Sequence, residues 1–161
     1  MKIRSLFITS AILFATTLAS AAPPPDPDQK EITAFHLSMD NISKFGNASA
    51  ALLKLTRDNP DLKKQMEAED SKNKTVQSTV DVMEKKYPAA AAAIRAAGLS
   101  TRDFVVMTGT IMSTTMAVGM KKQGMLKEIP DTVSPENAAF VEQNYDKINS
   151  MLTKMMSESS R

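Results

Sequence analysis

Residues 101–122 read TRDFVVMTGTIMSTTMAVGMKK, and this stretch decides the fold. Between Asp103 and Lys121 it has no ionisable side chain. Ser100 followed three residues later by Asp103 is typical of a helix start, while Lys121 and Lys122 suit the negative end of a helix. Because a helix without charged residues has no strongly polar face, we expect it to be buried on most sides. It should therefore lie at the centre of a helical bundle.

Four methionines lie in this stretch, and two interpretations of them are open. Met112 and Met116 are one helical turn apart, as are Met116 and Met120, so their thioethers can face the same side of the helix. Thioethers are soft ligands that favour cuprous copper, which makes Met112 and Met116 candidate metal ligands. Methionine also fills irregular gaps in protein cores. Because we expect the helix to be buried, we favour core packing for the methionines of residues 107–120.

His36 is the only histidine of the chain, and it precedes Met39 by three residues. The segment 30–45, KEITAFHLSMDNISKF, has the apolar spacing of one helix face. The residues on that face are Ile32, Phe35, Met39 and Ile42. A partly buried imidazole bonded to a neighbouring group is the simplest expectation for His36. His36 and Met39 are also candidates for binding a haem or a metal ion, but no motif supports this, and we assign no cofactor.

The N-terminus has the features of a secretory signal peptide. Lys2 and Arg4 precede an apolar run, and the small residues 19–21 (ASA) match a cleavage site, so we expect cleavage after Ala21. The run is shorter than the roughly 20 residues needed to cross a bilayer. We therefore expect a periplasmic or secreted protein without a stable membrane anchor.

Composition excludes several classes of function. The chain has 20 basic and 18 acidic residues, and two of the basic ones, Lys2 and Arg4, belong to the leader. The rest has no basic excess, so we do not expect it to bind nucleic acid. The absence of cysteine excludes disulfides, thiolate metal sites and a cysteine nucleophile, and favours a bacterial origin. Asn41, Asn47 and Asn73 match the Asn-x-Ser/Thr pattern, and their modification is left open.

The remaining chain divides into three parts. Residues 22–29 include PPPDPD and should form a proline-rich spacer, because proline fixes its own dihedral and lacks the amide proton. Residues 30–157 should form one helical domain, and residues 158–161 a frayed tail. We predict an all-α, single-domain bundle of five or six helices around residues 101–122. Whether residues 30–57 form one bent helix or two is left open.

Helix-start signals divide this domain further. Asn59 before Pro60 and Ser134 before Pro135 each place a capping side chain ahead of a proline at the first helical position. The last helix then has a regular apolar stripe, which predicts that it packs along its length. The stripe consists of Ala138, Val141, Tyr145, Ile148, Leu152 and Met155.

Two segments carry a resemblance to known proteins. Residues 96–117, AAGLSTRDFVVMTGTIMSTTMA, and residues 134–148, SPENAAFVEQNYDKI, resemble a group of short, helical bacterial proteins that have a signal peptide and no assigned activity. NISKF at 41–45 and DNPDL at 58–62 are similar to the same group. The resemblance implies an exported helical fold and no functional residues. The paired Leu-Thr-x-x-Gln motif of helical periplasmic stress chaperones is missing.

The sequence offers no catalytic residue. The acidic residues between Glu67 and Glu84 alternate with lysines, which is typical of a solvated helix face. We expect a non-catalytic binding or scaffold module of the bacterial cell envelope, whose partner is an envelope protein or a small apolar ligand. The alternative is a periplasmic carrier of haem or cuprous copper that uses His36 and the methionines.

Overall fold

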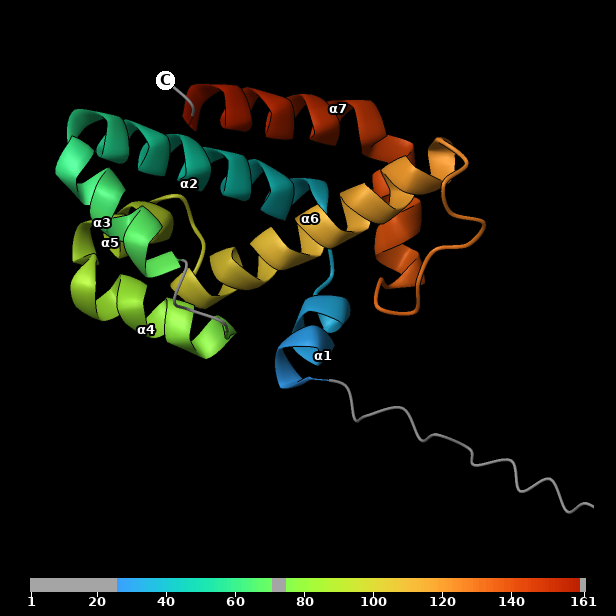
Figure 1. The fold of residues 1–161 in the computed structure, drawn as a ribbon, viewed down its shortest axis with the longest axis horizontal. Coiled ribbons are helices and arrows are strands. Elements are labelled where there is room, and N and C mark those ends of the chain that lie inside the picture. The colour runs from blue at the N-terminus through green and yellow to red at the C-terminus, as the bar shows by residue number, and fades with distance from the viewer. Residues whose placement is uncertain (1–25, 71–74, 160–161) are drawn as a thin grey trace, which may run out of the picture.

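The computed structural model describes residues 26–70 and 75–159, and this part of the chain forms seven helices and no strand. They are α1 (Pro27–Ala34), α2 (Met39–Asp58), α3 (Pro60–Asp70), α4 (Val76–Lys86), α5 (Pro88–Ala96), α6 (Thr101–Lys122) and α7 (Pro135–Ser159). Figure 1 shows α6 crossing the middle of the molecule, with helices on several sides of it. The all-α bundle predicted from the sequence is confirmed, with seven helices instead of five or six. The expected leader, residues 1–21, lies outside the described part.

A break at residues 35–38 separates α1 from α2. Ser38 begins α2 with a capping box: the Asn41 amide donates to Ser38 Oγ over 3.3 Å, and the Ser38 amide donates to Asn41 Oδ1 over 2.8 Å. Residues 30–57 therefore belong to two helices. Gly46 lies inside α2, where an added Cβ would lie 3.3 Å from Met151 Sδ of α7.

The boundaries of the domain differ from those predicted. Pro27 begins α1 inside the segment 22–29 that was expected to be a spacer, because proline is allowed in the first turn and Asp26 caps the helix by accepting from the Asp28 amide over 3.1 Å. At the other end, α7 continues to Ser159, into the expected tail. The helical domain is thus slightly longer at both ends than residues 30–157.

The core of the bundle is built on α6, as its lack of charge predicted. It contacts α1, α2, α4, α5 and α7. The buried residues of α6 are Thr101, Val106, Met107, Thr110, Ile111, Thr114, Thr115, Ala117, Val118 and Gly119. Small residues permit close helix crossings here: an added Cβ at Gly109 would lie 2.9 Å from Ile32 Cδ1 of α1.

The predicted helix starts are confirmed. The side chains of Asn59, Ser100 and Ser134 each accept a hydrogen bond from the backbone amide three residues further on, over 3.1, 2.9 and 3.4 Å. The apolar stripe of α7 packs inward as predicted, with Val141 and Ile148 fully buried. Asn144 has non-helical dihedrals and kinks α7, a feature that the stripe did not indicate.

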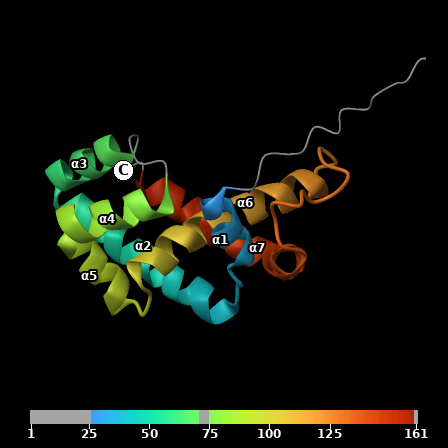
Figure 2. The same cartoon turned by 90° about the horizontal axis from the view of Figure 1, so that it is seen from below.

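The helices are unevenly distributed along the molecule. Figure 2 shows α3, α4 and α5 gathered at one end, while the link between α6 and α7 lies at the other. Helix α2 contacts α3 and α5, and α4 contacts α5 and α6. The N-terminal half of α6 is thus surrounded by short helices, and the candidate site lies among them.

Candidate functional site

The methionines of α6 are divided between the core and the surface. Met107 is fully buried, whereas the exposed fractions of Met112 and Met116 are 52% and 66%, and Met120 is half-buried. The prediction of core packing is therefore wrong for Met112 and Met116. The absence of charge predicted burial on most sides, but threonine, serine and methionine also occupy the face of α6 that meets solvent.

His36 is not on a helix, because it lies in the link between α1 and α2. Its side chain is 72% exposed, and its Nδ1 lies 3.4 Å from Glu136 Oε2 of α7. The expected partly buried imidazole on a helix face is thus wrong. Met39 is half-buried at the start of α2, and neither His36 nor Met39 lines the hollows described next.

An apolar hollow of about 470 Å³ lies between α2, α3, α4 and α6. Its size falls within the range of roughly 300–1,000 Å³ found for small-molecule sites. Its apolar lining consists of Leu52, Met66, Val82, Met83, Tyr87, Phe104 and Val105. Its polar lining consists of Thr56, Lys63, Glu67, Glu69, Thr79 and Thr108.

A second hollow of about 330 Å³ adjoins the first, because Leu52, Thr56 and Phe104 line both. On α2 its lining includes Leu53. At the end of α7, Met155 and Met156 complete the lining. Ser49 lies at this hollow with a buried Oγ that has no hydrogen-bond partner among the described residues. The two hollows share part of their apolar lining, and we call them together the α2–α6 groove.

Direct contacts hold the walls of the α2–α6 groove in place. Lys86 Nζ of α4 lies 3.1 Å from Glu69 Oε2 of α3, so the two helices on one side are joined by an ion pair. On the other side, the rings of Phe45 of α2 and Phe104 of α6 stack with centroids 5.0 Å apart. The groove is therefore framed by contacts between its own helices.

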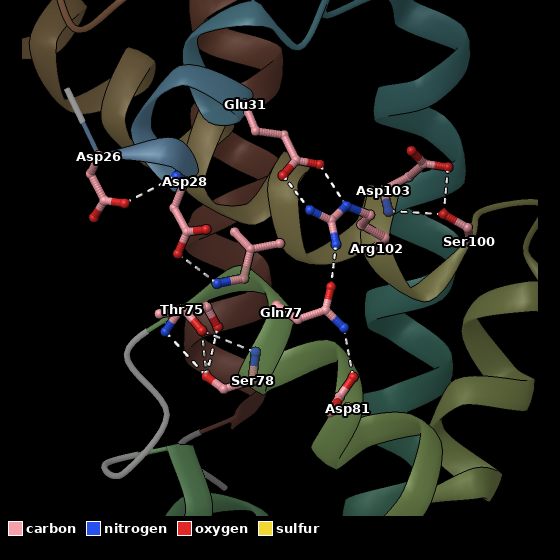
Figure 3. A network of polar contacts seen from close by, with 11 residues as sticks. Asp26, Asp28, Glu31, Thr75, Gln77, Ser78, Asp81, Ser100, Arg102 and Asp103 are labelled. Carbon is pink, nitrogen blue, oxygen red and sulfur yellow. Dashed lines mark hydrogen bonds and ion pairs between the residues drawn. The ribbon is translucent and has the colours of Figure 1, made fainter. Parts of the chain in front are cut away.

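At the start of α6, Arg102 joins three helices (Figure 3). Its Nε and Nη2 donate to the two carboxylate oxygens of Glu31 on α1 over 2.7 and 2.6 Å, and its Nη1 donates to Gln77 Oε1 on α4 over 2.8 Å. The hydrogen bonds that Arg102 donates to Glu31 raise the pKa of Arg102. Nearby, the Val76 amide at the start of α4 donates to Asp28 Oδ2 over 2.8 Å. These bonds fix α1 and α4 to the start of α6.

Glu84 joins α4 to the two helices that follow it. It accepts a hydrogen bond from the Thr101 hydroxyl of α6 and two from Arg95 Nη1 of α5, over 2.9 and 2.8 Å. These bonds lower the pKa of the Glu84 carboxyl. The bond from Thr101 has the largest effect, and the bonds from Arg95 come next. On the same helix, bonds from Lys85 and then from Gln77 lower the pKa of Asp81.

Asn137 of α7 is a structural residue that sequence reasoning missed. It is 1% exposed, its Nδ2 donates to the Phe35 carbonyl over 2.7 Å, and its Oδ1 accepts from the Leu37 amide over 2.9 Å. One side chain thus satisfies two backbone groups of the link that carries His36. Its position in SPEN, just after a helix start, gave no signal for a partner 100 residues earlier.

The chemistry available at the α2–α6 groove is binding of apolar groups. In residues 26–70 and 75–159, no three or more histidine, aspartate or glutamate side chains are grouped so as to hold a metal ion. No helix in those ranges is long and apolar enough to cross a membrane. Comparisons with protein-family models, with curated proteins and with solved structures found no match.

Proposed function

We propose that this chain is an exported, non-catalytic binding protein of the bacterial cell envelope, and that it holds a single-chain amphiphile in the α2–α6 groove. The observation that carries the proposal is that two adjoining hollows, both mainly apolar, share Leu52, Thr56 and Phe104 in their linings. An extended hydrocarbon chain can occupy both hollows, whereas a compact ligand occupies one. The exported location rests on the leader sequence and on the resemblance to signal-bearing helical proteins.

The edge of the groove suits the polar end of such a ligand. Thr56, Thr79 and Thr108 provide hydroxyl groups beside the apolar lining. A few polar groups around a mainly apolar hollow are typical of ligand sites, where they set the orientation of the ligand.

The test fills the groove without adding charge. Val82 of α4 is half-buried in its lining, and Val82→Phe places a ring where the ligand chain would lie. Binding is measured by displacement of a fluorescent naphthylamine probe with hexadecanoate. We expect Val82→Phe to weaken binding of both compounds by at least about tenfold, which corresponds to about 1.4 kcal/mol.

The matched control is Ile129→Phe, a half-buried aliphatic position that lines a different hollow in the link after α6. It should bind the probe and hexadecanoate like the wild type, and thermal unfolding checks that both variants are folded. Failure of the wild type to bind either compound would contradict the proposal. Equal affinities for the wild type and a folded Val82→Phe variant would also contradict it.

A further inference from the structure

Met112, Met116 and Met120 form a row on the side of α6 that faces away from the core. They occupy successive turns of the helix, so their Cβ atoms follow one another at about 5–6 Å. Methionine has three rotatable bonds, which allow the sulfur atoms of two residues one turn apart to approach one ion, whereas Met112 and Met120 are separated by about 12 Å along the helix axis. None of the three residues lines the α2–α6 groove. The proposed function therefore leaves this row unexplained.

Packing does not account for the row either. Met107 shows what a core methionine of α6 looks like, because it is 0% exposed, whereas Met112 is 52% and Met116 66% exposed. Long apolar side chains on a solvent-facing helix surface contribute little to stability, because their apolar area stays in contact with water. A role that requires accessible sulfur atoms gives these positions a reason to hold methionine.

The electrostatic surroundings suit a soft monovalent cation. Ionisable side chains are absent from α6 between Asp103 and Lys121. The two lysines that follow are engaged with α7: Lys121 Nζ lies 2.9 Å from Glu142 Oε1, and Lys122 Nζ lies 4.3 Å from the ring centroid of Tyr145.

We propose that Met112 and Met116, one turn apart, form a binding site for cuprous copper on the surface of α6. Neutral thioethers are soft ligands that select copper(I) over zinc or magnesium. This site is independent of the α2–α6 groove. Loss of copper binding would therefore leave the proposed amphiphile binding intact, and loss of amphiphile binding would leave the copper site intact.

The first test is competition for copper(I) against a chromophoric cuprous chelator, without oxygen and with a reductant. The double variant Met112→Leu, Met116→Leu keeps the shape, the apolar character and the helix propensity of the row but removes two sulfur atoms. We expect its copper(I) affinity to fall by at least about tenfold. The control Met156→Leu removes an equally exposed methionine of α7, 65% exposed, and should bind copper(I) like the wild type.

The second test observes the sulfur ligands directly. With [methyl-¹³C]methionine, copper(I) should shift the methyl signals of Met112 and Met116 and leave that of Met107 in place, while zinc(II) should shift none of them. Unchanged copper affinity in the folded double variant would overturn the proposal. Equal loss in Met156→Leu would overturn it too, and so would shifts spread over methionines elsewhere in the chain. If the methionine row were instead a docking face for another protein, leucine would replace methionine without loss. The double variant would then have the same copper affinity as the wild type.

Discussion

At the scale of single residues, two buried threonines of α6 differ in their hydrogen bonds. Thr110 Oγ1 lies 2.8 Å from the Ile32 carbonyl of α1 and 3.0 Å from the Val106 carbonyl, whereas Thr115 Oγ1 has no partner in the part of the chain described here. Thr115→Val removes an unpaired group, so we expect the free energy of unfolding to rise by about 1 kcal/mol. Thr110→Val should lower it by about 1–3 kcal/mol, because the Ile32 carbonyl loses its donor. Urea denaturation measures both, and the opposite order would show that the hydroxyls are satisfied differently.

Asn137 makes the strongest prediction at this scale. Its replacement by alanine leaves the Phe35 carbonyl and the Leu37 amide without their partner in a buried place. We expect the free energy of unfolding of Asn137→Ala to fall by about 2–4 kcal/mol, since each unsatisfied buried group costs about 1–3 kcal/mol. Asn149→Ala, at an exposed position of the same helix, is the control and should change stability little. A loss no greater than that of the control would show that the link does not depend on Asn137.

At the scale of helices, the sequence predicted most starts, ends and inward faces. Caps at Asn59, Ser100 and Ser134 are local, so the residues that form them are adjacent in the sequence. The break at residues 35–38 was missed because the apolar spacing continues across it, from Ile32 to Ile42. That break is held by Asn137, about 100 residues away, and no local pattern reports such a bond.

Glu84 gives a prediction about acid stability at the same scale. Its pKa is lowered in the folded protein, chiefly by the Thr101 hydroxyl and then by Arg95. A carboxyl with a lowered pKa stabilises the fold above its ordinary value of 4.5, and this contribution is lost as the pH falls through the lowered value. Melting temperatures of the wild type should therefore decrease below about pH 4.5.

The variant Glu84→Gln cannot titrate, so its melting temperature should be lower at pH 7 and should fall less steeply between pH 5 and 3. Glu128→Gln, in the link between α6 and α7, is the control and should follow the wild-type curve. Parallel curves for the wild type and Glu84→Gln would mean that Glu84 does not link α4 to α5 and α6 through its charged form.

At the scale of the whole molecule, the bundle was predictable and the groove was not. The uncharged stretch 104–120 indicated a central helix, and that position is confirmed. Which of its faces remains open depends on how the other helices surround it, so the exposure of Met112 and Met116 could not be predicted. Leu52 and Met66 are half-buried, and the groove they line exists only where α2, α3, α4 and α6 meet.

The central claim is that the α2–α6 groove holds an apolar chain, and methyl NMR tests it most directly. Hexadecanoate is titrated into protein labelled with ¹³C at the methyl groups of leucine, valine and methionine. The account predicts saturable shifts at Leu52, Met66, Val82 and Val105, with little change at Met112 and Met116. Shifts absent from these four residues, or centred on the methionine row of α6, would contradict it.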